Sequence, residues 1–210
     1  MKDLQSYFNQ KLKSRADRVT RWEIGLSGGL DSVVLLHLAA RSLPAGKLRV
    51  VNIDHQLQSE SARWSDFCGR LAGSLNIPFV SHKVVVAAGA SLEQAARKAR
   101  YQVFEELLQP GDCLLLAHHL DDQAETMLFR LLRGTGVRGL AGIPDSRVLG
   151  QAELYRPLLS ITRQELQSWA RAEQLEWIED PSNADLSYDR NYLRHKVLPL
   201  LQARWPGFAR

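Results

Sequence analysis

Short runs of β-branched and aromatic residues alternate with longer amphipathic segments through most of this 210-residue chain. The short runs, which we expect to be strands, are 22–26, 48–53, 79–86 and 113–117. The longer segments, in which apolar residues recur at helical spacing, are 32–40, 61–75, 92–108 and 124–132. This alternation predicts βαβ units and therefore an α/β fold with a mainly parallel sheet. Right-handed crossovers would place the carboxyl ends of all the strands at one edge of the sheet.

Composition supports one domain of this class. Hydrophobic residues make up 45% of the chain, which is enough for a sizeable core. A glycine-rich segment at 134–150, expected to be a loop, separates the first 150 residues from a more polar part at 151–210, and two helix starts carry capping boxes, at 91–94 and 162–165. No apolar run approaches the roughly 20 residues of a membrane span and no signal peptide precedes the first strand, so we expect a soluble, cytoplasmic protein.

Charge and cysteine content narrow the classes of partner. The net charge is +4 and arginine outnumbers lysine, a bias that suits phosphate contacts and permits a nucleic-acid partner without proving one. Cys68 and Cys113 lie far apart and outside any C-x-x-C spacing, which predicts buried thiols rather than a disulfide, zinc or iron–sulfur site. Trp64, Trp169 and Trp177 are expected to be packing residues.

The segment 24–32, Ile-Gly-Leu-Ser-Gly-Gly-Leu-Asp-Ser, leads from an expected strand into an apolar helix. Glycines before a helix N-terminus favour anion binding, because free backbone N–H groups and the helix dipole converge there and a phosphate can approach closely. The Walker A and dinucleotide-binding patterns are both absent. A plain glycine-rich turn is the alternative, but two serines and an aspartate at this spacing favour a pyrophosphate-binding loop made of Ser27, Gly28, Gly29, Leu30, Asp31 and Ser32.

A second polar segment, 118–126, reads His-His-Leu-Asp-Asp-Gln-Ala-Glu-Thr where an expected strand gives way to a helix. Asp122 and Glu125 are three residues apart and Asp121 and Glu125 are four apart, so their side chains would share a helix face. Converging carboxylates can hold Mg²⁺ or a substrate ammonium group. The helix dipole also favours acids in a first turn, so this segment alone leaves both interpretations open.

Residues 27–32 match the Ser-Gly-Gly-x-Asp-Ser motif without departure, and on these residues the chain resembles the PP-loop ATP pyrophosphatase family. Residues 118–126, with the Leu-Leu-Arg-Gly-Thr-Gly-Val-Arg-Gly-Leu-Ala-Gly run at 131–142, are similar to its lysidine synthetase branch. Further segments of that branch match at 54–55, 95–101, 156–159, 179–183 and 189–195. The matches extend over most of the chain.

This resemblance implies a Rossmann-like three-layer αβα fold, with residues 1–150 as the PP-loop ATP-binding catalytic domain and 151–210 as the C-terminal part of the same core. Larger members of the branch carry further C-terminal domains, so the chain is expected to be a fragment. The implied cofactors are ATP and Mg²⁺, and the implied partners are free L-lysine and a tRNA(Ile) with a CAU anticodon. A homodimer is compatible with the sequence, which leaves the oligomeric state open.

The resemblance also assigns site residues. The loop 27–32 would bind ATP, and Asp31 and Asp122 would hold Mg²⁺. The residues expected to be catalytic or to bind lysine are Asp122, Glu125 and Arg97. Those expected to contact tRNA or phosphate are Arg100, Arg133, Arg190 and Arg194, and secondary candidates are Asp54, His55, His118, His119 and Asp121. Ordinary solvated helix faces explain the arginines as an alternative, and a capping aspartate with a solvated histidine explains Asp54 and His55.

The implied enzyme is a ligase that forms a carbon–nitrogen bond. Oxygen O2 of the wobble cytidine would attack the α-phosphate of ATP, and the amine of lysine would then displace AMP, which gives lysidine and changes the codon read from AUG to AUA. A flipped-out base requires an anticodon loop rather than a duplex.

Three alternatives remain. A tRNA 2-thiolation enzyme would share the loop but use paired cysteines, which Cys68 and Cys113 do not suit. An amidating synthetase of the NAD or GMP type would carry different residues after its loop. A non-catalytic adenine-nucleotide sensor would bind ATP and release no pyrophosphate.

Overall fold

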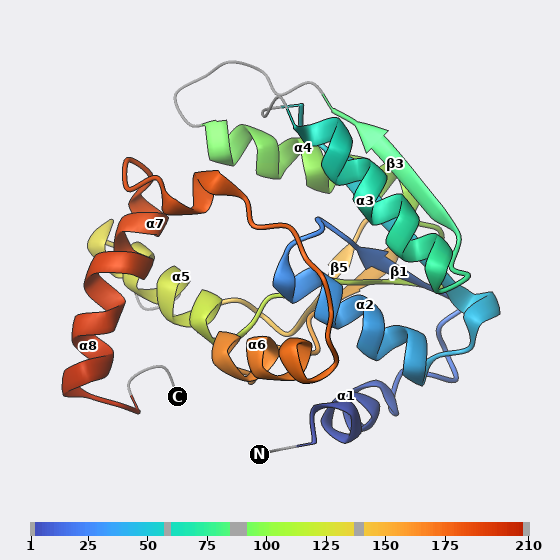
Figure 1. The fold of residues 1–210 in the computed structure, drawn as a ribbon, viewed down its shortest axis with the longest axis horizontal. Coiled ribbons are helices and arrows are strands. Elements are labelled where there is room, and N and C mark those ends of the chain that lie inside the picture. Colours follow the sequence, from blue (N-terminus) through green and yellow to red (C-terminus); the bar gives the residue numbers. More distant parts are fainter. Residues whose placement is uncertain (1–2, 57–59, 85–91, 137–140, 208–210) are drawn as a thin grey trace.

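The computed structural model of the chain describes residues 3–56, 60–84, 92–136 and 141–207 (Figure 1). The strands are β1 (Arg21–Gly25), β2 (Leu48–Asp54), β3 (Phe79–Lys83), β4 (Asp112–Leu115), β5 (Ser146–Leu149) and β6 (Ala152–Tyr155). The α-helices are α1 (Leu4–Leu12), α2 (Leu30–Ser42), α3 (Ser61–Ser74), α4 (Leu92–Leu107), α5 (Leu120–Leu132), α6 (Arg163–Ala172), α7 (Asp189–Tyr192) and α8 (Leu198–Arg204). A π-helical turn, Leu193–Val197, joins α7 to α8.

The six strands form one sheet in the order β3-β2-β1-β4-β6-β5. All neighbouring pairs are parallel except β5 with β6, which is antiparallel. The predicted α/β fold with a mainly parallel sheet is therefore confirmed. The prediction that 134–150 is a loop is wrong in part, because Ser146–Leu149 forms the edge strand β5. Arg147 and Val148 of this strand are exposed, so it lacks the apolar pattern that marks a buried strand.

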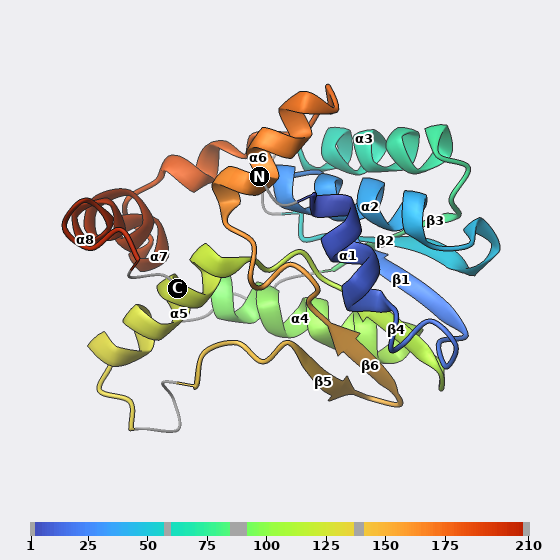
Figure 2. The same ribbon diagram turned by 90° about the horizontal axis from the view of Figure 1, so that it is seen from below.

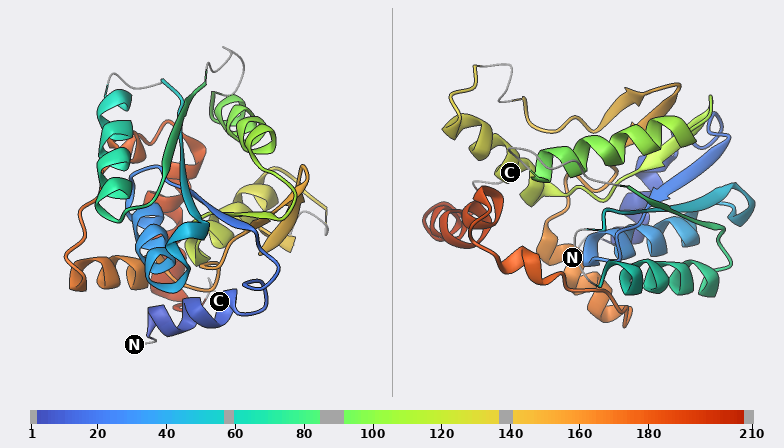
Figure 3. Two further views of the ribbon diagram at one scale, coloured as in Figure 1. Left: turned by 90° about the vertical axis from the view of Figure 1, so that its right-hand side faces the viewer. Right: turned by 90° about the horizontal axis from the view of Figure 1, so that it is seen from above.

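Two apolar clusters, one on each face of the sheet, form the core. The larger cluster joins inward residues of the central strands, such as Ile24 and Leu115, to α1, α2, α3 and α6. The smaller joins the opposite side of the same strands to α4, with Leu114 packed against Phe104. Figures 2 and 3 show the sheet between helices α2 and α3 on one face and α4 on the other. None of the helices in the described part of the chain is long and apolar enough to cross a lipid bilayer.

Strand order reverses between β1 and β4. From β1 the chain proceeds outward to β2 and β3, and then returns through α4 to β4 on the other side of β1. Loops at the carboxyl ends of two such strands diverge to opposite faces, which leaves a crevice where ligands bind in open α/β sheets. Gly25 permits close packing here, because a Cβ at this position would lie 2.6 Å from Cδ2 of Leu116. The two predicted polar segments both begin at this crevice.

A charged network also lies within the sheet. Glu23, in the central strand β1, is fully buried, and its carboxylate contacts Arg21 and Arg49 at 2.7 Å each. Arg21 in turn contacts Asp112 of β4 at 2.9 Å. The charges of three neighbouring strands are thereby paired within the sheet.

The structure tests one of the two predicted capping boxes. Thr162 accepts a hydrogen bond from the backbone N–H of Glu165, and the carboxylate of Glu165 accepts one from the backbone N–H of Thr162. The predicted box at the start of α6 is therefore confirmed. The box predicted at 91–94 lies outside the residues whose side chains the structure describes.

Candidate active site

The loop between β1 and α2 is shaped by its own hydroxyl groups. The Oγ of Ser32 accepts a hydrogen bond from the backbone N–H of Ser27 (3.2 Å) and donates one to the carbonyl of Gly29 (3.0 Å). The two serine hydroxyls lie 3.1 Å apart. Gly29 is the N-cap of α2 and has no side chain with which to cap it. The first backbone N–H groups of α2 thus lie at a glycine-lined turn, an arrangement suited to binding an anion.

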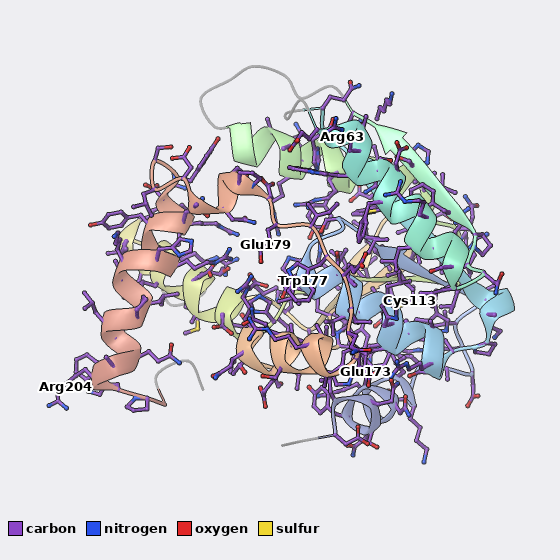
Figure 4. All side chains as sticks on the ribbon, viewed as in Figure 1. Arg63, Cys113, Glu173, Trp177, Glu179 and Arg204 are labelled. Atoms are coloured by element: carbon purple, nitrogen blue, oxygen red, sulfur yellow. The ribbon has the colours of Figure 1, made fainter. Side chains whose placement is uncertain are left out.

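A segment from the C-terminal third lies against this loop. The backbone N–H of Ile178 donates to the carbonyl of Gly28 (2.9 Å), and a Cβ on Gly28 would lie 2.9 Å from Cδ1 of Ile178 and 3.2 Å from Sγ of Cys68. Trp177 and Glu179, the sequence neighbours of Ile178, are labelled in Figure 4. Gly28, at φ 85°, is therefore required both by its backbone conformation and by this close packing.

A cavity of about 870 Å³ opens between this loop, the end of β2, α3 and the C-terminal segment. Its volume lies within the range of small-molecule sites. Residues that line it include Ser27, Asp31, Asp54, His55, Trp177 and Arg194. Trp177 packs against the core as predicted, and so does Trp169, but Trp177 and Trp64 also line the cavity. No motif in the sequence distinguished these two tryptophans from ordinary packing residues.

His119, the N-cap of α5, is a buried cation at the crevice. Its Nε2 lies 3.5 Å from Oδ2 of Asp31 and 3.7 Å from Oδ2 of Asp122, and its Nδ1 lies 3.6 Å from Oδ2 of Asp121. Burial alone would lower the pKa of the imidazole, but Asp121, Asp31 and the charge of Asp122 outweigh it and raise that pKa to about 10. His119 is therefore protonated at neutral pH and links the loop after β1 to the start of α5.

Glu125 and Arg194 form a buried ion pair. The guanidinium of Arg194 contacts both carboxylate oxygens of Glu125, with Nη2 2.9 Å from Oε2, and lies 3.7 Å from Oδ1 of Asp122. Glu125 is only 1% exposed, whereas Arg194 also lines the cavity. The carboxylate expected to bind lysine thus already pairs with a cation of the chain, and the arginine expected to contact RNA lines the cavity beside the loop at 27–32.

The neighbouring histidines at the end of β4 face opposite layers. His119 contacts Asp31 on the α2 side, whereas Nδ1 of His118 lies 3.3 Å from Nε of Arg156, which follows β6. Burial and the charge of Arg156 lower the pKa of His118 well below its ordinary value. His118 is consequently neutral and accepts the arginine's hydrogen bond.

Asp54 and His55 lie at the end of β2, as predicted. Asp54 is buried and accepts a hydrogen bond from the backbone N–H of Gln56 (2.9 Å), which is the loop-capping role left open by the sequence. Burial, and then the charge of Arg100, lower the pKa of His55 to about 4. His55 therefore reaches the cavity as a neutral imidazole.

Three of the four remaining expected arginines lie over two aromatic rings, and the fourth, Arg100, lowers the pKa values of His55 and Tyr101 through its charge. Arg133 and Arg190 lie over the ring of Phe129, with Cζ 5.0 and 5.9 Å from its centroid. Arg97 lies over Tyr101 of α4 at 5.0 Å. Neither group lines the large cavity, so the predicted arginines occupy at least two separate surfaces.

Asp31 is better suited than Asp122 to contact Mg²⁺. Its Oδ1 is buried and has no hydrogen-bond partner among the described residues, so one hard oxygen ligand is available. Asp122 instead accepts from the backbone N–H of His119 and faces the cation of Arg194. The described residues contain no cluster of three or more side chains arranged to hold a metal by themselves. Mg²⁺ at nucleotide sites needs only one or two carboxylates because phosphates and water supply the other ligands.

Comparison with known proteins identifies the family. A model of the PP-loop domain, a family of ATP-binding domains, matches residues 2–201. This chain belongs to the PP-loop domain family. The resemblance inferred from residues 27–32 is confirmed. A tRNA(Ile)-lysidine synthase of Pseudomonas fluorescens is 52% identical over 192 residues, which are 89% of this chain and 43% of that relative. The corresponding enzyme of Haemophilus ducreyi is 44% identical and covers 98% and 47%. The chain thus spans less than half the length of these curated relatives.

Solved structures of the same fold have diverged in sequence. A U34-tRNA thiolase from Methanococcus maripaludis, solved with its [4Fe-4S] cluster, superposes with a TM-score of 0.73 at 18% identity, covering 99% of this chain and 77% of that one. An NH3-dependent NAD synthetase from Campylobacter jejuni superposes with a TM-score of 0.52 at 16% identity, covering 96% and 82%. These similarities confirm the three-layer PP-loop fold.

The cysteines of this chain do not favour a thiolation enzyme. Cys68 and Cys113 are free and fully buried, and burial raises the pKa of each thiol to about 12. A thiol in this state is protonated and unreactive. The predicted buried thiols are confirmed.

Proposed function

We propose that this PP-loop domain catalyses the ATP-dependent ligation of L-lysine to C2 of the wobble cytidine in the CAU anticodon of tRNA(Ile), a carbon–nitrogen bond-forming reaction. The observation that carries the proposal is a cavity of about 870 Å³ in which the loop at 27–32 meets the segment 177–184 of the C-terminal third. Identity near 50% to tRNA(Ile)-lysidine synthases over most of the chain supports this substrate. The cytoplasm, where ATP, lysine and tRNA meet, is the location we propose, and a homodimer stays a prediction.

In this proposal the loop at 27–32 binds the phosphates of ATP. The backbone N–H groups at the start of α2 and the hydroxyl of Ser27 are the donors, and protonated His119 adds positive charge beside them. Mg²⁺, held by Asp31 and by phosphate oxygens, would neutralise charge on the triphosphate. Arg194, fixed by Glu125, faces the cavity and can stabilise charge at the α-phosphate.

The first chemical step forms a bond from O2 of the cytidine to the α-phosphorus and breaks the bond between the α- and β-phosphates. Pyrophosphate leaves with the electron pair, and the base becomes adenylated. In the second step the lysine amine, having lost a proton, bonds to C2, and AMP leaves with the C2–O electron pair. Asp122 is the carboxylate that we propose to bind the lysine, and Arg97 stays a candidate for a catalytic or lysine-binding role.

The role of Glu125 is refined by its geometry. Because both of its oxygens contact Arg194, we propose that Glu125 positions that guanidinium rather than binding free lysine. Replacement by Gln would then slow the reaction without abolishing lysine binding. This assigns a positioning role to a residue expected from the sequence to contact the substrate.

The test uses this chain with ATP, Mg²⁺, radiolabelled lysine and a tRNA bearing the CAU anticodon. We expect pyrophosphate release and lysine incorporation in equal amounts, because both products derive from one adenylated intermediate. Asp31→Ala should reduce both by about 100-fold, a typical effect of losing one charge-stabilising group. Asp66→Ala, which removes an exposed carboxylate of α3, is the matched control and should retain full activity.

Each other outcome has a distinct meaning. Pyrophosphate release without lysine incorporation would indicate another acceptor. ATP binding without pyrophosphate release in any combination of substrates would favour the nucleotide sensor. Equal loss in Asp31→Ala and Asp66→Ala would contradict the assignment of the loop.

A further inference from the structure

Arginine side chains surround Tyr101 on the side of the sheet that faces α4. Arg97 and Arg147 lie over its ring, with Cζ 5.0 and 4.7 Å from the centroid. Arg156 approaches the phenol oxygen, with Nη2 at 3.5 Å, and also donates to the carbonyl of Pro144 (2.7 Å). These side chains come from α4, from the edge strand β5 and from the residue after β6. We call Arg97, Tyr101, Arg147 and Arg156 the Tyr101 cluster.

The Tyr101 cluster has an excess of positive charge. Among the described residues, no carboxylate lies within 4.0 Å of the guanidinium groups of Arg97, Arg147 or Arg156. The partly exposed arginines at 15, 21, 49 and 194, by contrast, each pair with an acid. Arg156 is only 3% exposed. Its hydrogen-bond partners are all uncharged: the neutral imidazole of His118, the carbonyl of Pro144 and the phenol of Tyr101. Cations converge at a buried site at a cost in free energy unless an anion compensates them.

The pKa shifts of Tyr101 and Arg156 also indicate an excess of positive charge in the cluster. Burial would raise the pKa of the phenol, but the charges of Arg97 and Arg156 outweigh burial and lower it. Burial likewise lowers the pKa of Arg156, and Arg147 and Arg97 add to that effect, whereas Tyr101 opposes it. The cluster therefore favours a negative charge at the phenol or beside it.

We propose that the Tyr101 cluster binds a phosphodiester group of the RNA substrate. None of the four residues lines the cavity in which we propose that ATP binds. The phosphates of ATP would therefore contact the loop at 27–32 and not the Tyr101 cluster. Arg147 lies exposed on the outermost strand, where an extended polyanion can reach it. Arginine forks donate to two phosphate oxygens at once, and the phenol supplies a third donor. This inference rests on the proposed RNA substrate.

The test is binding of an RNA anticodon stem-loop with a CAU loop, measured by fluorescence anisotropy over a salt series without ATP or lysine. Arg147→Ala should weaken binding by about tenfold, the effect of one charge-assisted contact. It should also reduce the slope of log affinity against log salt by about 0.7. Arg171→Ala removes an exposed arginine from the last turn of α6 and should leave both values unchanged.

Two further measurements discriminate between anions. Tyr101→Phe removes a neutral donor, so it should weaken RNA binding by a smaller factor and leave the salt slope unchanged. ATP affinity should be the same in Arg147→Ala as in the parent chain. Equal RNA affinity in Arg147→Ala and Arg171→Ala would overturn the proposal, as would a parallel loss of ATP affinity, which would assign the cluster to the nucleotide. Because neither ATP nor lysine is present in the RNA measurement, a chain that binds RNA but ligates nothing contradicts the proposed function alone.

Discussion

Gly28 combines two demands that other residues cannot meet. Its φ of 85° lies in the left-handed region, and Ile178 and Cys68 occupy the space that a side chain would need. We expect Gly28→Ala to lower the free energy of unfolding by about 2 kcal/mol, from backbone strain and displaced packing. Urea unfolding followed by circular dichroism measures this value.

The adjacent glycine supplies the control. A Cβ on Gly29 would lie no closer than 3.7 Å to its neighbours, and its backbone is extended, so Gly29→Ala should change stability little. Equal destabilisation by the two substitutions would show that the side chain of Ile178 can move aside, and that its close approach to the loop does not require glycine at position 28.

Sequence alone predicted a glycine-rich turn from a strand into a helix at 27–32, because glycine and serine spacing favours the hydrogen bonds of such a turn. The helix begins earlier than expected, at Leu30 rather than at residue 32. Sequence alone did not predict that Glu125 would pair with Arg194, since two residues 69 positions apart can be related only through the fold. Nor did it assign a charge to His119, because that charge depends on three carboxylates brought together by the first turns of α2 and α5.

At the scale of elements, β1 carries a buried charge in the middle of the sheet. Glu23→Gln would leave Arg21 and Arg49 without their shared carboxylate, and breaking a buried pair in this way costs about 3 kcal/mol. Glu153→Gln is the matched control, because Glu153 also lies on a strand and contacts two arginines, Arg15 and Arg18, but is partly exposed. Its loss should cost less than about 1 kcal/mol.

Chemical denaturation of both variants gives the comparison, provided that the dependence on denaturant concentration stays constant. If Glu23→Gln proved as stable as Glu153→Gln, the arginines would have to be solvated in the folded state, and the network would add nothing to the stability of the sheet.

The strands β1 to β4 were predictable, as 22–26, 48–53, 79–86 and 113–117, because these segments are rich in apolar and β-branched residues. The structure ends β3 at Lys83 and places β4 at Asp112–Leu115, and residues 85–86 of the predicted range lie outside the described residues. The strands β5 and β6 were not predicted. β5 has four residues with two exposed, and it pairs only with β6, so its position depends on the sheet rather than on its own pattern.

Considered as a whole, the molecule has a nucleotide-binding half whose site is completed by its last third. Arg194→Met would leave the carboxylate of Glu125 buried without a partner and should lower the free energy of unfolding by about 3 kcal/mol. Glu125→Gln in the same chain should recover most of this loss, because no buried charge then remains. The coupling energy from a double-mutant cycle in urea unfolding measures the effect.

Additive losses in that cycle would contradict the pairing, because independent sites show no coupling. The same cycle at Arg41 and Glu173, an exposed pair 2.6 Å apart that joins α2 to the end of α6, supplies a reference value below about 1 kcal/mol.

The contact between Ile178 and Gly28 also affects when the site can form during synthesis. Domains assemble as their residues leave the ribosome, and contacts between distant residues form last. The loop at 27–32 and the first strand emerge early, but the residues that cover the loop and hold Glu125 emerge near the end of this chain. A nascent chain halted before Ile178 therefore presents the phosphate-binding loop uncovered, and the enclosed site arises only after the residues up to Arg194 have emerged.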